Sequence, residues 1–200
     1  MFTIGYSRHQ TLKKKMEENT YLDNTLYLPI QDEEMYIEAV DGKETVADAR
    51  DIFAFPLINQ TSILSMSVSG NPSERLSVMP YEVLGEQKFE EMFLNLSSDF
   101  ERLILGQAQI ANFCRRYLTW IKNRNTPTVF LTPIERTYAM VFVERLNTAW
   151  DSDEVYYSTA QENLLLLDMA MFPHGPYCKR GARDRDRFVV PNLKNLPILP

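Results

Sequence analysis

The sequence has few of the residues that build cross-linked or membrane-spanning proteins. Its 200 residues include two cysteines, Cys114 and Cys178, which are too few for a disulfide framework and lack the paired spacing of a zinc site. The longest apolar run, Leu164 to Phe172, contains Asp168 and is too short to cross a bilayer as a helix. The N-terminus has no apolar signal core. These absences predict a reduced cytoplasmic protein, or one in a virus particle assembled there, without metal, cofactor or membrane contact.

Catalytic fingerprints are also missing. The sequence contains no P-loop, no GxGxxG and no GxSxG motif. His174 and Cys178 are spaced for a base and thiol pair, with Lys179 and Arg180 beside them to lower the thiol pKa. A cysteine nucleophile also needs an oxyanion site, however, and the only other histidine is His9. The sequence therefore leans against an enzyme.

Glycine is scarce, and the charge balance is acidic. Seven glycines against 11 prolines indicate defined loops rather than flexible linkers. A hydrophobic share of 44% in a chain of this length is enough for one packed core. The formal charge of -6 argues against a surface devoted wholly to nucleic acid or anionic lipid. This net charge is still compatible with a local basic patch.

Residues 98–122 carry the strongest helical pattern. Ser98 and Glu101 have the spacing of a capping box. One apolar stripe at three- and four-residue spacing consists of Phe100, Leu103, Ile104, Ala108, Ala111, Cys114, Leu118 and Ile121. A second consists of Ile110, Phe113, Tyr117 and Trp120. Together they predict a long helix that forms the axis of the core, with a helix shared with another subunit as the alternative.

The rest of the chain predicts an α+β fold in which an N-terminal antiparallel sheet packs with three or four helices. Strands are expected at 26–30 and 35–40, which could form a hairpin, at 51–60, at 61–70 and at 75–80. Pro56 makes the third an edge strand, and the alternation in 61–70 is the cleanest in the chain. A short strand at 128–131 and helices at 86–96, 133–150 and 164–172 follow. Thr132 and Glu135 frame the best capping box.

The predicted domain boundary lies after Phe172. Residues 1–172 form a single α+β domain, sheet-rich over 20–80 and helical over 86–172, and residues 173–200 form a basic loop and an extended arm. The loop 174–187 carries the basic side chains Lys179, Arg180, Arg183, Arg185 and Arg187 against Asp184 and Asp186. Such a surplus suits the phosphate backbone of nucleic acid, or an acidic partner or a structural ion-pair network.

The arm after Arg187 is apolar and spaced by prolines. Pro191, Pro197 and Pro200 prevent a helix. The side chains that need cover, and that we predict to bind a partner, are Val189, Val190, Leu193, Leu196, Ile198 and Leu199. The groove that receives them could lie on this subunit or on an adjacent one. The sequence thus favours a non-catalytic structural or interaction subunit of a multi-protein assembly, such as a virus particle, over a nucleic-acid-associated subunit.

Overall fold

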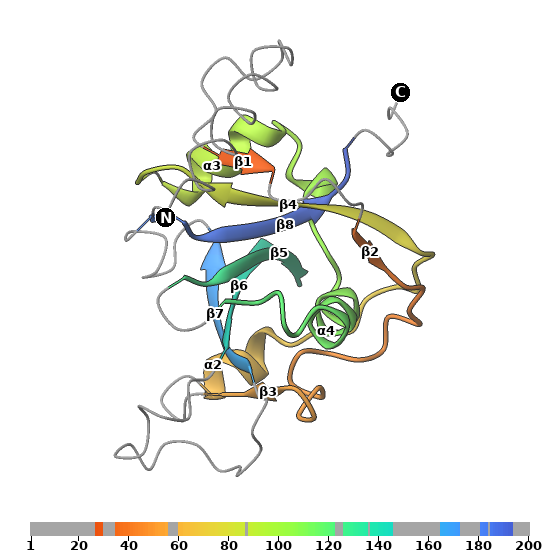
Figure 1. Ribbon diagram of the computed structural model, residues 1–200. Helices are drawn as coiled ribbons and strands as arrows, with labels where there is room; N and C mark the ends of the chain where they lie inside the picture. Colours follow the sequence, from red (N-terminus) through yellow and green to blue (C-terminus); the bar gives the residue numbers. More distant parts are fainter. Residues whose placement is uncertain are drawn as a thin grey trace, which may run out of the picture.

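The structure, a computed structural model, has an α+β fold and describes residues 27–29, 35–55, 60–86, 88–122, 126–135, 137–145, 165–172, 181–183 and 185–193 (Figure 1). The strands are β1 (Tyr27–Pro29), β2 (Met35–Ile37), β3 (Phe53–Ala54), β4 (Leu76–Val83), β5 (Thr128–Ile134), β6 (Thr137–Arg145), β7 (Leu165–Phe172) and β8 (Arg187–Pro191). The helices described are α2 (Gln60–Met66), α3 (Phe89–Leu96), α4 (Gln107–Arg116) and a short 3-10 helix, η2 (Phe100–Arg102).

All eight strands belong to one mixed sheet. The strand order is β1-β4-β8-β5-β6-β7-β3, and β2 pairs with β4 as well. Neighbours are antiparallel except for β5 with β8 and β3 with β7, which are parallel. The sheet therefore spans the chain and is not confined to its N-terminal part, because the C-terminal strand β8 joins β4 to the β5, β6 and β7 strands (Figure 1).

Both faces of the sheet are covered. Along β7, Leu165, Leu167 and Met169 point to one face, while Ala170 and Phe172 point to the other, as alternation in a strand requires. The first face packs against α4 and α2, and we call it the α4 face. The second packs against α3 and η2, and we call it the α3 face. Strands buried on both faces lose the polar alternation that usually identifies them.

This double burial explains why two helix predictions were wrong. Residues 137–145 of the expected helix at 133–150 form β6, and residues 165–172 of the next one form β7. Both segments are near-continuous apolar runs, which fit a buried helix and a buried strand equally well. The proposed helix start at Thr132 and Pro133 lies instead at the end of β5, where Pro133 pairs with Tyr138 in an antiparallel hairpin.

The prediction for residues 61–70 was also wrong, in the opposite direction. Helix α2 occupies Gln60–Met66 and buries Ile63 and Met66, which are one turn apart. Leu64, which the alternating pattern placed inside, is 50% exposed. Serine hydroxyls bond back to helix carbonyls, with Ser67 Oγ donating to Ile63 O at 2.8 Å. The serines thus satisfy helix carbonyls rather than line the polar face of a strand.

The predicted long helix is shorter than expected and begins later. The first turn is η2, where the Asp99 carboxylate, not the Ser98 hydroxyl, accepts from Glu101 N at 3.0 Å. The chain then extends, with Leu105 N donating to Leu131 O at 2.8 Å, before α4 begins after Gly106. These backbone bonds to β5 compete with helix formation and end the first turn.

The predicted burial of the second apolar stripe is confirmed for α4, but the helix covers one face of the sheet and is not the axis of the core. Ile110 and Phe113 from the second stripe have no exposed surface, and Tyr117 and Trp120 pack against the same core. The expected strands at β1, β2, β4 and β5, the helix α3 and the edge position of β3 are also confirmed. The suggested hairpin of the first two strands is not, because β1 and β2 both pair with β4.

Candidate contact surfaces

Helix α4 supplies polar side chains to backbone groups of the segments around it. Gln107 is 2% exposed, and its amide accepts from Val46 N at 3.2 Å and donates to Met66 O at 2.9 Å. Because a buried backbone group without a partner is costly, this one side chain fixes the loop before β3 and the end of α2 on the α4 face.

The same helix closes the outer edge of β2. Asn112 Oδ1 accepts from Glu38 N at 3.1 Å. The Tyr117 hydroxyl accepts from Tyr36 N at 3.0 Å and donates to Tyr36 O at 3.2 Å. These bonds occupy backbone groups that a strand of another chain would otherwise pair with, so β2 is a protected edge.

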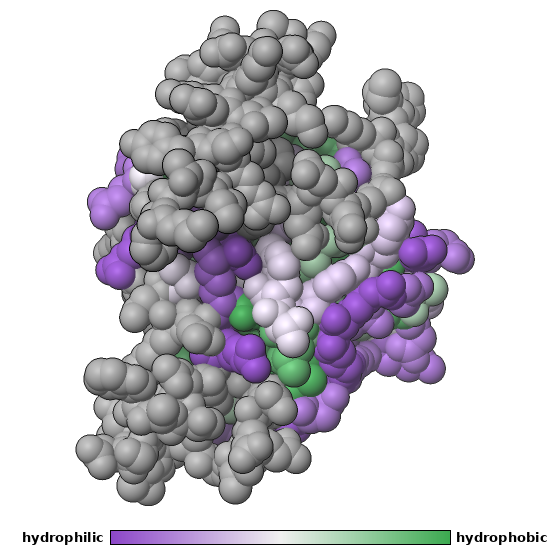
Figure 2. All heavy atoms as spheres, viewed as in Figure 1, coloured by the Kyte–Doolittle hydropathy of each residue, from purple (hydrophilic) through white to green (hydrophobic). Residues whose placement is uncertain are grey.

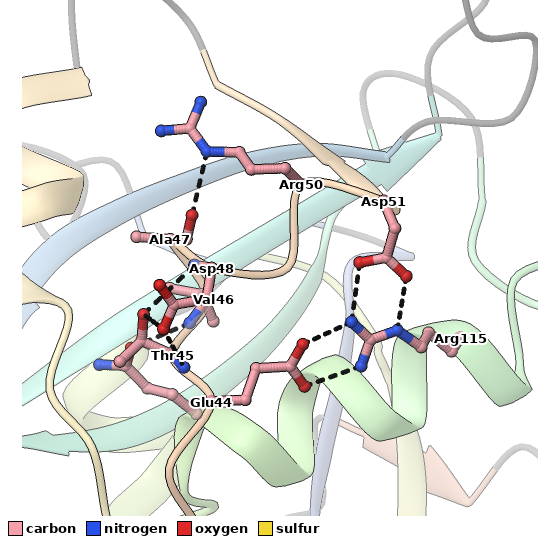
Figure 3. Close-up of polar contacts among 9 residues, drawn as sticks. Glu44, Thr45, Val46, Ala47, Asp48, Arg50, Asp51 and Arg115 are labelled. Carbon is pink, nitrogen blue, oxygen red and sulfur yellow. Dashed lines mark hydrogen bonds and ion pairs between the residues drawn. The ribbon is translucent and has the colours of Figure 1, made fainter.

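Arg115, in the last turn of α4, is held by two carboxylates. It donates to both oxygens of Asp51, at 2.8 and 2.7 Å, and to both oxygens of Glu44, at 2.8 and 2.5 Å. Figure 3 shows the guanidinium between the two acidic side chains of the loop before β3. Hydrogen bonds from Arg115 lower the pKa of Asp51, and the bonds to Glu44 and Asp51 raise the pKa of Arg115. We call Arg115 with Glu44 and Asp51 the clamp. Its role is structural, since few N–H donors of the Arg115 guanidinium remain for a ligand.

The loop before β3 is further ordered by its own side chains. The Asp48 carboxylate accepts from Thr45 N at 2.9 Å and from the Thr45 hydroxyl at 2.8 Å, and these bonds lower the pKa of Asp48. Arg50 Nε donates to Ala47 O at 3.0 Å (Figure 3). The acidic groups of this loop therefore serve the turn and the clamp.

A second arginine group lies at the other side of the same helix end. Arg116 Nη1 donates to Glu38 Oε1, and Arg75 Nε lies 3.8 Å from Glu38 Oε2. The Arg75 guanidinium lies 4.1 Å from the centre of the Tyr36 ring, and that of Arg116 lies 5.7 Å from the Tyr117 ring. In Figure 2, hydrophilic residues gather on the right of the molecule, where Figure 1 places β2, the start of β4 and α4.

Arg187, predicted as a nucleic-acid contact, is turned into the protein. Its side chain is 13% exposed, lies 4.5 Å from the centre of the Trp120 ring, and donates through Nη1 to Trp120 O at 2.8 Å. Glu82 lies beside it on β4, with Arg187 Nε 3.6 Å and Lys122 Nζ 2.9 Å from its carboxylate. Burial lowers the pKa of Arg187 despite that carboxylate. The guanidinium therefore has a structural position on the α4 face.

The other members of the basic loop are divided between the described and the undescribed parts of the chain. Arg183 and Arg185 are exposed on the approach to β8. Asp186 is 3% exposed and accepts from Arg183 N at 2.9 Å, so it orders the turn. Lys179 and Arg180 lie outside the described residues.

The predicted arm begins as an internal strand. Val189 and Val190 have no exposed surface and lie in β8, between β4 and β5. In this fold they cover the two faces of the sheet and offer no surface to a partner. Leu193 is half-buried against the α3 face. Leu196, Ile198 and Leu199 lie outside the described residues.

Cys114 has no access to solvent in this fold. Its side chain is fully buried on α4, and burial raises the pKa of its thiol. His174 and Cys178 lie outside the described residues, so their pairing stays a prediction. Within the described ranges, histidine, cysteine and acidic side chains form no cluster that could hold a metal ion. None of the helices described is long and apolar enough to span a membrane.

Sequence reasoning did not find the two arginine groups of α4. Arg115 and Arg116 appeared only as polar gaps between apolar stripes, and their carboxylate partners lie far away in the sequence. The one available signal was the pair of arginines at the end of an apolar helix pattern. The dipole of a helix favours cations near its C-terminus.

Comparison of the chain with protein-family models, curated proteins and solved structures finds no match.

Proposed function

We propose that the chain is a non-catalytic interaction subunit of a multi-protein assembly, such as a virus particle, and that the segment after Leu193 contacts the neighbouring protein. The observation that supports this is the place where the segment begins. Asn192 N donates to Ser77 O at 2.9 Å, and Asn192 Nδ2 lies 3.3 Å from Ser77 Oγ. The last described residues are thus fastened to β4, and the chain continues from a fixed point on the sheet.

The sequence that continues from this point is suited to a partner. Leu196, Ile198 and Leu199 are apolar, and Pro197 and Pro200 favour an extended backbone. An extended apolar segment gains affinity from a groove or a sheet edge of another chain. The proposed contact set is therefore narrower than the arm as a whole, because Val189 and Val190 belong to this chain's own sheet.

The test compares the full chain with a chain that ends after Asn195, which retains all of β8. We expect equal melting temperatures, since every described residue is kept, and loss of self-association or of the copurifying partner in the shorter chain. Light scattering after size exclusion and copurification from the native source measure this. The variant Leu94→Asp is the control, because Leu94 is an exposed leucine on α3, 45% accessible, far from the arm in sequence. Two chains that are equally monomeric and recover nothing would contradict the proposal.

A nucleic-acid-associated subunit is the second candidate, supported by the exposure of Arg183 and Arg185 on the approach to β8. On this proposal, Lys179, Arg180, Arg183 and Arg185 contact phosphates, whereas Arg187 does not. Binding to a single-stranded oligonucleotide should weaken with salt, and Arg183→Ala with Arg185→Ala should reduce the salt slope by about 1.4. Absence of binding even at low salt would remove this candidate.

A further inference from the structure

Two exposed arginines share a single carboxylate where β2, β4 and α4 meet. Arg75, Arg116 and Glu38 have side-chain exposures of 56%, 43% and 47%. Each guanidinium faces a different oxygen of Glu38. Counted over these three groups, one positive charge is left without a matching negative charge. We propose that Arg75 and Arg116 form a recognition site for a carboxylate side chain of an acidic partner protein.

The site is held in place before any partner arrives. Glu38 N donates to Asn112 Oδ1, and the side chain of Tyr117, which lies near Arg116, is tied through its hydroxyl to the backbone N and O of Tyr36, whose ring lies beneath Arg75. Stacking on a tyrosine restricts a guanidinium to a plane while leaving its edges open. A partner thus meets arginines whose conformational freedom is already reduced, which lowers the entropy lost on binding.

Unused donors point to an anionic ligand. Arg75 has no acceptor within hydrogen-bond distance among the described residues, since its contact with Glu38 is 3.8 Å long. Arg116 uses Nη1 for Glu38 and also interacts with the side chain of Tyr117, which leaves part of its five-donor guanidinium open. A guanidinium has five N–H donors in a fork that matches a carboxylate, so each arginine can bind a second acidic group without releasing Glu38.

The local charge favours a monoanion over a phosphate or a nucleic acid. One incoming carboxylate neutralises the surplus charge of the site. A phosphate dianion leaves a negative surplus, and the neighbouring clamp is already negative, since Arg115 is matched by both Glu44 and Asp51. A continuous polyanion would also meet that clamp and a chain whose formal charge is -6.

The test measures binding of a peptide with a single glutamate and no other charged side chain, labelled with a fluorophore of no net charge, to the full chain by anisotropy at constant ionic strength. Arg75→Ala and Arg116→Ala should each weaken binding about 3- to 10-fold, and Glu38→Gln should strengthen it about 3-fold. Arg75→Lys should weaken binding nearly as much as Arg75→Ala, because lysine lacks the paired N–H donors of a guanidinium. The matched control is Arg50→Ala, since Arg50 is an exposed arginine stacked on Phe55 at 4.4 Å, and it should bind as the parent does.

The outcomes separate this site from general attraction and from the C-terminal arm. Equal losses in Arg50→Ala and Arg75→Ala would show unspecific charge attraction and overturn the proposal. Tighter binding of a phosphoserine peptide or an oligodeoxythymidine through the same arginines would overturn the choice of a carboxylate. The chain ending after Asn195 should bind the peptide as the full chain does, so failure of the arm proposal leaves this result unchanged.

Discussion

The Tyr117 hydroxyl and the backbone of Tyr36 form a reciprocal pair, in which the phenol oxygen accepts from the amide at 3.0 Å and donates to the carbonyl at 3.2 Å. The side chain that caps the C-terminus of α4 thereby bonds to backbone groups at a strand edge. The pairing joins the end of the helix on one face of the sheet to a strand whose only strand partner among the described residues is β4.

Removing this hydroxyl should destabilise the fold. Tyr117→Phe keeps the ring on Phe113, 4.8 Å between centres, but removes the hydroxyl that bonds to Tyr36 N and Tyr36 O. We expect a loss of about 1–2 kcal/mol in the free energy of unfolding. Urea denaturation measures it. Tyr138→Phe is the matched control, because the half-buried Tyr138 hydroxyl makes no hydrogen bond within the described part of the chain; equal losses in both variants would contradict the pairing.

Gln107 should be the most sensitive polar position of α4. Gln107→Ala leaves Val46 N and Met66 O unpaired in a buried place, which should cost about 2–4 kcal/mol. Gln109→Ala, two positions along the helix, should cost less than about 1 kcal/mol, because Gln109 is half-buried and water can replace it. Thermal and urea unfolding compare the two. A smaller loss of unfolding free energy for Gln107→Ala than for Gln109→Ala would be inconsistent with the hydrogen bonds of Gln107 to Val46 N and Met66 O.

The Arg115 clamp should make stability depend on pH at the acidic end. Arg115→Met keeps the aliphatic stem and removes the fork, and should cost about 1 kcal/mol at pH 7, since the groups are partly exposed. The pKa of Asp51 is lowered in the folded chain, so its contribution is full above pH of about 4 and is lost as the pH falls through the lowered value.

The difference between parent and Arg115→Met should therefore narrow as the pH falls below about 4. Melting temperatures of the two chains between pH 7 and pH 3 give this difference directly. Arg50→Met is the control, because among the described residues Arg50 pairs with no carboxylate: its Nε donates to Ala47 O, its guanidinium lies over the Phe55 ring, and its charge adds only a minor part to the lowered pKa of Asp48. A difference in melting temperature between parent and Arg115→Met that stays constant over the whole pH range would show that Asp51 does not cause the pH dependence.

The buried thiol of Cys114 should be inert in the folded chain. In a Cys178→Ser variant, reaction with a disulfide reagent at pH 8 should proceed only at the rate of unfolding, because the thiol is inaccessible and burial raises its pKa. Unfolding in urea should release one fast-reacting thiol. Fast reaction of the native variant would mean that α4 opens far more readily than its packing indicates.

What the sequence predicted correctly depends on local pattern. The apolar spacing around Ile110 and Phe113 identified helix α4 because that helix buries a wide stripe, and β4 was identified because buried and half-buried residues alternate from Val78 to Tyr81. In β6 both sets are buried, as with Val141 and Phe142, and in β7 the half-buried Leu166 between buried leucines is itself a leucine, so neither sequence carries a clear period of two.

The arginine positions could not be predicted for a different reason. Arg187 lies beside Glu82 because β8 inserts next to β4, a pairing between distant segments that no local pattern specifies. A charged loop and an apolar tail were the visible features, and the strand between them consists of residues from both. Arg187, which was assigned to the basic loop, therefore belongs to the sheet. Val189 and Val190, which were assigned to the tail, belong to it as well.

This division of the basic loop leads to a direct comparison. Arg187→Ala should cost about 2–3 kcal/mol, because it removes the bond to Trp120 O and leaves the half-buried Glu82 with Lys122 alone. Arg183→Ala should change stability by less than about 0.5 kcal/mol, since that side chain is exposed. Urea unfolding of both variants tests the assignment. Equal effects would place Arg187 on the surface, whereas a large effect confined to Arg187 would mean that the cation belongs to the core of this fold and not to a ligand site.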